Sequence, residues 1–340
     1  MTVRIHFAGL VPGQPLVLVS WAAFSHDPRL SSSTAVHFGR ELADAFGRHW
    51  SVASEIADCD VVVYPHSYVD GPATAAVADA ARRAGKPCLF FSQDERIPPS
   101  SLAYGVLYRS SIFKRLPHER CHPVFILDAR EETRGIYPET LPKEAPPRVG
   151  FCGFVGTPAG RLFYRLLGAR QKVEGLAFRA RVLAALRRDP RIRCDIVARS
   201  SYLGHAPMAA FDKAHPLATE RDVFLRNLFE CPYALAMRGK GNHSVRFYEI
   251  MSAARIPLFI NTGCVLPLEA EIDWRNLLAW VEDRDLPSIG EHLIRFHESI
   301  SPEEFDERQR RIRSLWESRL LPIPFFRHVL DTVARGRPAP

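Results

Sequence analysis

The segment over residues 231–261 reads CPYALAMRGKGNHSVRFYEIMSAARIPLFIN. Its apolar run over 232–237 predicts a buried strand, and a glycine-containing loop follows it. Apolar residues then recur at helical spacing over 244–254, and a second apolar run covers 256–260. A strand, a helix and a second strand of these lengths predict a βαβ unit, in which the two strands run parallel.

The same alternation extends along the rest of the chain. In the second half it predicts strands over 148–154, 192–198 and 277–281, and helices over 174–188, 219–229, 288–299, 302–319 and 325–335. In the first half it predicts strands over 3–8, 60–66, 87–92 and 121–127, and helices over 33–46 and 73–84. We therefore expect an α/β protein with two Rossmann-like domains facing across a cleft.

A proline-rich segment separates the two halves. It holds four prolines in the eleven residues 138–148, and proline can extend neither a helix nor a central strand. We expect an interdomain linker here. The predicted division is an N-terminal domain over 1–145, a C-terminal domain over 146–320, and a helix and tail over 321–340 that pack back on the N-terminal domain.

The loop after the 232–237 strand has the composition of an anion site. Gly239 and Gly241 allow close approach of a ligand, and Asn242 or Ser244 can cap the helix that follows. Free N–H groups at a helix start favour an anion. Positive side chains around this end come from Arg238, Lys240 and Arg246. The pattern predicts a cradle for a diphosphate, although its spacing is not that of a Walker A loop.

The 244–254 helix presents two residues beside its apolar face. Arg246 and Glu249 are three positions apart on the flank of the face formed by Phe247, Ile250, Met251 and Ala254. One interpretation is that Glu249 accepts hydrogen bonds from ribose hydroxyls while Arg246 meets phosphate. The other is an ordinary ion pair within the helix, which spacing alone favours.

The second half resembles the exostosin-type glycosyltransferase family. After Arg238, the matching segments are SVRFYE from Ser244, RIPLFI from Arg255, LPLE from Leu266 and IDW from Ile272. That family has an Arg-Gly loop, a Ser-x-Arg-x-Phe helix start, a Gly-x-Ile-Pro-Val strand and a Leu-Pro-Phe…Asp-Trp segment in this order. The resemblance covers about 45 residues well.

The resemblance implies the two-domain architecture called GT-B and an inverting glycosyltransferase that needs no metal or other cofactor. Its donor would be a nucleoside diphosphate sugar, with a UDP-sugar expected, bound in the second domain. Its acceptor would be a glycan or a lipid-linked glycan in polysaccharide biosynthesis.

Carried over by position, the resemblance assigns roles to individual residues. Arg238 and Arg246 would neutralise the diphosphate, Ser244 would bind phosphate, and Glu249 would hold the ribose; Lys240 and Asn242 lie in the same loop. Two departures stand out. Ala254-Arg255 replaces the frequent glycine before Ile-Pro, and the turn after the next strand reads NTGC from Asn261 instead of carrying an acid. The second departure leaves the donor sugar open.

Two further features bear on the reaction. The strand end GFCGFVG over 150–156 would let Gly153 contact the donor, or would simply make a tight turn. Inversion needs a base for the acceptor hydroxyl, which we expect from the first domain: Asp94 first, then His66. The pair Asp58 and Asp60 imitates a metal motif but is expected to mark the entry of a strand.

Charge divides unevenly between the halves. Residues 1–150 carry 16 Lys+Arg and 16 Asp+Glu, so the net charge of +7 comes from residues 151–340, with 29 and 22. The densest part is 161–193, with ten basic and two acidic residues. It predicts either peripheral contact with a membrane or a solvated helix face. No pattern of a nucleic-acid-binding module occurs.

Seven scattered cysteines without a CxxC pair indicate buried hydrophobes in a reducing compartment. No run of some 20 apolar residues occurs. We therefore expect a cytoplasmic protein, peripheral at most to the inner face of a membrane. Two other functions stay open: a catalytically silent partner subunit that binds nucleotide or glycan, and a nucleotide-sugar epimerase.

Overall fold

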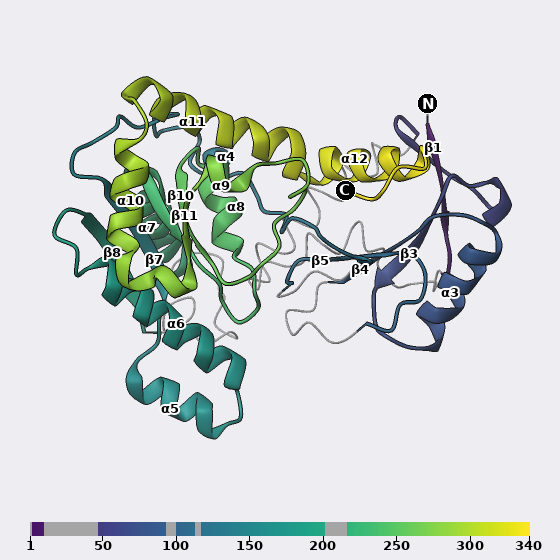
Figure 1. The fold of residues 1–340 in the computed structure, drawn as a ribbon, viewed down its shortest axis with the longest axis horizontal. Coiled ribbons are helices and arrows are strands. Elements are labelled where there is room, and N and C mark those ends of the chain that lie inside the picture. The colour runs from purple at the N-terminus through teal and green to yellow at the C-terminus, as the bar shows by residue number, and fades with distance from the viewer. Residues whose placement is uncertain (1, 10–46, 93–99, 113–116, 201–215) are drawn as a thin grey trace. The chain divides into compact units, whose positions relative to one another are not determined.

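The computed structural model describes residues 2–9, 47–92, 100–112, 117–200 and 216–340. They fall into two compact units, which are described separately (Figure 1). Unit 1 comprises Met1–Leu127, Gly263–Asp273 and Glu317–Pro340, and unit 2 comprises Asp128–Thr262 and Trp274–Trp316. The chain thus leaves unit 1 twice, after Leu127 and after Asp273, and returns to it each time. The helix expected over 33–46 lies outside the described residues.

Unit 1 is built on a six-stranded parallel sheet in the order β2-β1-β3-β4-β5-β6. The strands are β1 (Val3–Phe7), β2 (Trp50–Val52), β3 (Val61–Ser67), β4 (Cys88–Ser92), β5 (Val106–Arg109) and β6 (Glu119–Cys121). Apolar runs such as 61–63 and 88–91 are buried without alternation. Such runs are typical of parallel strands that are covered on both faces.

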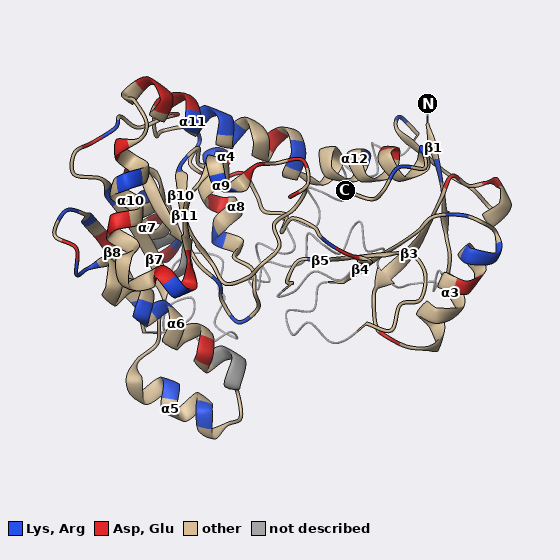
Figure 2. Ribbon diagram, in the orientation of Figure 1, with Lys and Arg blue, Asp and Glu red and all other residues tan. Residues whose placement is uncertain are grey.

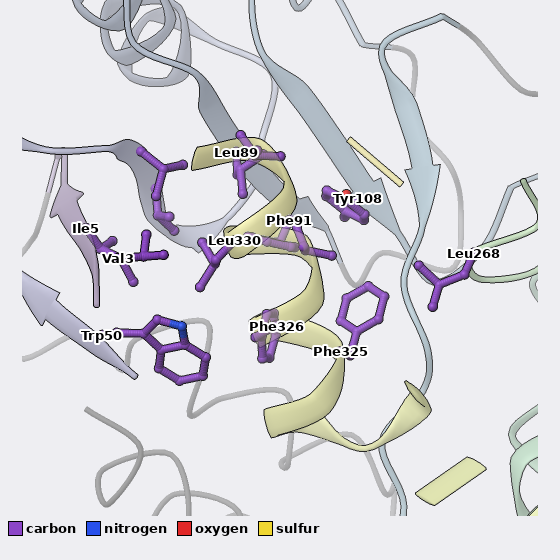
Figure 3. Packing of buried hydrophobic residues seen from close by; sticks show 14 of the residues in the cluster. Val3, Ile5, Trp50, Leu89, Phe91, Tyr108, Leu268, Phe325, Phe326 and Leu330 are labelled. Carbon is purple, nitrogen blue, oxygen red and sulfur yellow. The ribbon is translucent and has the colours of Figure 1, made fainter. Parts of the chain in front are cut away.

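Two apolar clusters cover the two faces of this sheet. On one face α12 (Pro322–Ala334) sets Phe326 against Phe91, with ring centroids 5.8 Å apart, and Phe325 against Tyr108 (Figure 3). The other face packs on α3 (Pro72–Arg83), with Phe90 in that cluster. Because neighbouring residues of a strand point to opposite faces, Phe90 and Phe91 belong to different clusters.

Unit 2 is built on a five-stranded parallel sheet in the order β11-β10-β9-β7-β8. Its strands are β7 (Arg148–Phe154), β8 (Arg193–Arg199), β9 (Tyr233–Ala236), β10 (Ile256–Asn261) and β11 (Ala279–Glu282). Its helices are α4 (Ala129–Glu132), α5 (Pro158–Leu166), α6 (Arg170–Leu186), α7 (Pro216–Glu230), α8 (Val245–Ser252), α9 (Trp274–Leu277), α10 (Ile289–Glu298) and α11 (Pro302–Leu315). The expectation of two Rossmann-like α/β domains is confirmed.

Several elements differ from those expected. The strand predicted over 121–127 is wrong beyond Cys121, because β6 covers only 119–121. Pro123 has no N–H group to donate to a neighbouring strand. The strands β2 and β5 are only three and four residues long, too short for a periodic pattern. The helix α5 begins Pro-Ala-Gly, a composition that is more typical of a loop.

The proline-rich segment is not a free linker but part of unit 2. The buried guanidinium of Arg255 donates to the carbonyls of Glu139 at 2.9 Å and Pro138 at 3.2 Å. Gln309 of α11 accepts from the amide of Leu141 at 2.9 Å and donates to its carbonyl at 2.8 Å. These bonds satisfy backbone groups that a segment without regular structure would otherwise leave to water.

A buried histidine lies under the sheet of unit 2. His297 of α10 is 6% exposed, and its Nδ1 lies 3.0 Å from the hydroxyl oxygen of Tyr233 on β9. Burial, together with the positive charge of Lys143, lowers the pKa of His297 to about 4. The imidazole is therefore neutral in the folded protein at neutral pH, whereas it titrates near 6.5 once unfolded.

This pKa difference predicts an acid-sensitive fold. Below pH 6.5 His297 becomes protonated in the unfolded chain, whereas in the folded protein it stays neutral down to about pH 4. The unfolded state therefore binds more protons in this window, and the free energy of unfolding falls as the pH drops through it. The free energy of unfolding should fall by about 2 kcal/mol between pH 8 and pH 5 on account of this group. Urea unfolding at both pH values measures it. His297→Gln should show a shallower pH dependence by that amount, and an unchanged dependence contradicts the assignment.

Candidate functional site

The candidate site of unit 2 lies where its strand order reverses. From β7 the chain goes to β8 on one side, and then returns to β9 on the other side of β7. Ligands of open α/β sheets bind beyond the carboxyl ends of the strands at such a switch point. The two ends here are Phe154 and Ala236. Gly153 and the loop from Arg238 to Ser244 therefore meet at this edge.

Arg246 lies across the end of β7. From the first turn of α8, its Nη2 donates to the Cys152 carbonyl at 2.5 Å, and its guanidinium carbon is 4.5 Å from the Phe151 ring centroid. Gly153 makes this position available, because a Cβ there would stand 2.5 Å from Nη2. Burial lowers the pKa of Arg246, and the charge of Glu249 acts in the opposite direction. The group remains a cation at neutral pH.

The loop after β9 is fixed by α6. Arg179 donates to the Phe154 carbonyl at 2.9 Å and to the Arg238 carbonyl at 3.3 Å, so it joins the ends of β7 and β9. Gly175, one turn earlier on α6, lets the loop pass close by, since a Cβ there would stand 2.2 Å from the Gly239 carbonyl oxygen. Sequence reasoning missed both residues. A glycine inside a helix was the available signal for Gly175.

The remaining loop residues take different positions. Asn242 is 1% exposed and joins the loops after β9 and β10, because its amide donates to the Thr262 carbonyl at 3.3 Å and accepts from the Thr262 hydroxyl. Ser244 occupies the N-cap position of α8, and within the described residues its side chain makes no capping hydrogen bond. Lys240 is exposed. The α8 amides are thus not covered by a cap from Ser244.

Glu249 is held by an arginine from another helix. Arg221 of α7 donates to its Oε1 at 2.7 Å and makes two bonds to Glu132 of α4, at 2.7 and 3.0 Å. Burial opposes the charge on Arg221, but Glu249 and Glu132 raise its pKa. The ion pair of Glu249 is therefore with α7, and not the pair with Arg246 that the helix spacing suggested.

Three arginines lie near one another at this end of the sheet. Besides Glu249, the charged groups that act on Arg246 are the guanidiniums of Arg199 at the end of β8 and of Arg221, both of which lower its pKa. Arg199 binds the Glu220 carboxylate at 2.7 Å, and Arg221 has its two carboxylates. Arg246 instead donates to a backbone carbonyl. Its charge is therefore the least neutralised of the three by hydrogen-bonded carboxylates.

The residues proposed as the catalytic base belong to unit 1. His66 lies within β3, not after it; it is 8% exposed, and its ring packs edge-on against Tyr64 with centroids 5.7 Å apart. Asp94 lies outside the described residues. Asp60 pairs with Arg4 at the entry of β3, as expected from its position before the strand.

The described part of the chain lacks both a cluster of metal ligands and a membrane-spanning helix. No group of three or more His, Cys, Asp or Glu side chains there is placed to hold a metal ion. None of the helices described there is long and apolar enough to cross a bilayer.

Sequence comparison connects the chain to the exostosins. Exostosin-1 of Drosophila melanogaster is 32% identical over 85 residues, which are 25% of this chain and 11% of exostosin-1. The resemblance to exostosins is confirmed. It spans only a quarter of this chain and about a ninth of that relative. No model of a known protein family matches the chain.

Among solved structures, the spinosyn rhamnosyltransferase SpnG complexed with thymidine diphosphate covers 92% of this chain and 79% of its own. The sequence identity is 15% and the TM-score is 0.33. At these values the match carries no argument about this protein, and the fold class stands on the two parallel sheets.

Proposed function

We propose that this protein is a glycosyltransferase that takes a sugar from a nucleoside diphosphate donor bound at the switch point of unit 2. The observation that carries the proposal is the Arg246 guanidinium, which lies over Gly153 at the carboxyl edge of the sheet and donates to a carbonyl instead of a carboxylate. The resemblance to exostosin-1, which covers a quarter of the chain, supports the same assignment.

The chemistry that this site would supply is electrostatic. When the bond from the sugar to the diphosphate breaks, negative charge develops on the leaving phosphate. Arg246, Arg238 and the first amides of α8 would stabilise that charge without a metal ion, and fixed charges act most strongly where water is excluded. In this account Ser244 and Lys240 bind phosphate oxygens from the same loop.

Glu249 would hold the ribose of the donor. Its Oε1 accepts from Arg221 at 2.7 Å, and its side chain is 14% exposed. A carboxylate oxygen accepts more than one hydrogen bond, so Arg221 can orient Glu249 while ribose hydroxyls bind. Arg221 is thus a positioning residue in this proposal.

We infer inversion at the anomeric carbon, a UDP-sugar donor, and a glycan or glycolipid acceptor of polysaccharide biosynthesis, all from the exostosin resemblance. Inversion requires a base that takes the acceptor proton as the new bond to the sugar forms. Asp94, or else His66, is proposed for that role.

A donor screen tests the proposal. UDP, GDP, CMP and dTDP compounds are added in the presence of a chelator, and thermal unfolding is followed. A ligand at a hundredfold excess over its dissociation constant adds about 2.7 kcal/mol of stability. We expect UDP compounds to respond. Transfer from the best donor is then measured: binding without turnover indicates a silent subunit, interconversion of the donor sugar indicates an epimerase, and no response to any nucleotide refutes the proposal.

A further inference from the structure

The helix α5 exposes a concentrated apolar face. Leu162, Phe163, Leu166 and Leu167 are 59%, 58%, 79% and 65% exposed. Within the described residues, these are four of the eight large hydrophobic side chains that are exposed, and they fall within six consecutive positions. Isolated exposed apolar residues are ordinary, whereas a contiguous patch indicates an interaction surface.

The four side chains lie on one side of a well-defined helix. At 3.6 residues per turn, positions 162, 163, 166 and 167 span about 140° of the helix surface. Thr157 caps the start, accepting from the Gly160 amide at 3.0 Å. At the other end the amide of Ala169 bonds back to the Tyr164 carbonyl at 2.9 Å, and Gly168 has a φ of +74°. These caps stabilise α5 as a helix although no residue of it is buried.

The charged residues of α5 itself are all positive. Arg161 and Arg165 follow each other along one edge of the apolar face, and residues 157–168 contain no acid (Figure 2). Basic residues continue beyond α5, since 161–193 holds ten Lys+Arg and two Asp+Glu. The combination of Leu and Phe with flanking arginine is typical of helices that lie in the interface of anionic membranes.

We propose that α5 is a membrane-surface anchor, which inserts Leu162, Phe163, Leu166 and Leu167 below the headgroups of an anionic phospholipid bilayer. Arg161 and Arg165 bind lipid phosphates at the same depth. A second copy of the chain fits this surface less well. Pairing two α5 faces would bring their arginines together, with no carboxylate on either helix to neutralise them. This anchor is separate from the nucleotide site and goes beyond the proposed function.

Vesicle sedimentation tests the anchor with the full chain. We expect binding to vesicles of equal phosphatidylglycerol and phosphatidylcholine, and much weaker binding to phosphatidylcholine alone. The double variant Leu162→Ser/Leu166→Ser should bind at least tenfold more weakly. The double variant Arg161→Gln/Arg165→Gln should lose about 30-fold, since each basic residue near an anionic surface contributes about 1 kcal/mol. Both should keep the wild-type unfolding temperature because the replaced side chains are not buried.

The matched control is Ile136→Ser, which removes an apolar side chain that is 76% exposed but lies outside α5. It should bind vesicles as the wild type does. Equal binding by wild type and the Leu162→Ser/Leu166→Ser variant overturns the anchor, as does equal affinity for neutral and anionic vesicles. The anchor is also overturned if the wild type sediments as a dimer and the Leu162→Ser/Leu166→Ser variant as a monomer, because a second copy of the chain would then cover the apolar face of α5. Nucleotide binding by the same variants should be unchanged, so that failure of the anchor and failure of the nucleotide site are distinguishable.

Discussion

Replacing Arg246 by alanine is expected to weaken the binding of a nucleoside diphosphate by about a hundredfold, because charge-assisted bonds to phosphate contribute about 1.5–3 kcal/mol. The guanidinium lies over Gly153 at the end of β7, where a diphosphate at the switch point would be. Calorimetric titration with UDP, or with the best nucleotide of the donor screen, measures the loss.

The control is Arg284→Ala, which removes an exposed arginine of the same unit, with a side chain 82% exposed. It should bind nucleotide as the wild type does. Arg246 also packs on the Phe151 ring, so its variant should be compared with the wild type by thermal unfolding without ligand. A folded Arg246→Ala protein that binds within twofold of the wild type contradicts the site.

Replacing Arg255 by leucine is expected to lower the free energy of unfolding by about 3 kcal/mol, because buried carbonyls lose their donors. This guanidinium donates to the carbonyls of Phe229, Glu139 and Pro138, with Phe229 at 2.9 Å. Burial, together with the charge of Arg130, lowers the pKa of Arg255 to about 9, and the group stays charged at neutral pH. The leucine variant no longer buries a charge, which offsets part of the effect. The loss in the free energy of unfolding is therefore smaller than the summed contributions of the hydrogen bonds.

Urea unfolding at neutral pH measures the effect. Arg255→Lys, which keeps the charge but reaches fewer carbonyls, should lose about half as much free energy. Arg284→Leu, on an exposed arginine, should change stability by less than about 0.5 kcal/mol. A loss below 1 kcal/mol for Arg255→Leu would mean that the carbonyls find water or other donors.

The strands and the glycine-containing loop after β9 were readable from the sequence because both depend on neighbouring residues. Apolar runs such as 232–237 and 256–260 mark buried parallel strands. Once strands alternate with helices, the loops after them must meet at one edge of a sheet. Gly153 and the loop before α8 come together for this reason, although their partners could not be foreseen.

The supporting contacts were not readable because they join residues far apart in the chain. Arg179 and the Arg238 carbonyl are 59 positions apart, and Arg221 and Glu132 are 89 apart. No periodicity links such pairs. The ion pair of Glu249 with Arg221 could not be foreseen for this reason, since spacing along one helix cannot reveal an arginine on another.

The departure from the exostosin pattern at residues 254 and 255 has a physical counterpart in the structure. Ala254 has a φ of +55°, the left-handed region in which glycine is strain-free and alanine is not. The next residue is Arg255, which carries the bonds to the proline-rich segment. The sequence showed that glycine was absent here, but not that the backbone still takes the conformation that glycine favours.

Hydrogen exchange with and without UDP locates a bound nucleotide on the chain, and so it tests the proposed nucleotide site of unit 2. At saturating nucleotide we expect slower amide exchange over residues 238–249 and at the end of β7, around Gly153, where the diphosphate and ribose would bind. Protection confined to other segments, or unchanged exchange in both of these at saturation, would contradict a nucleotide site at the switch point of unit 2.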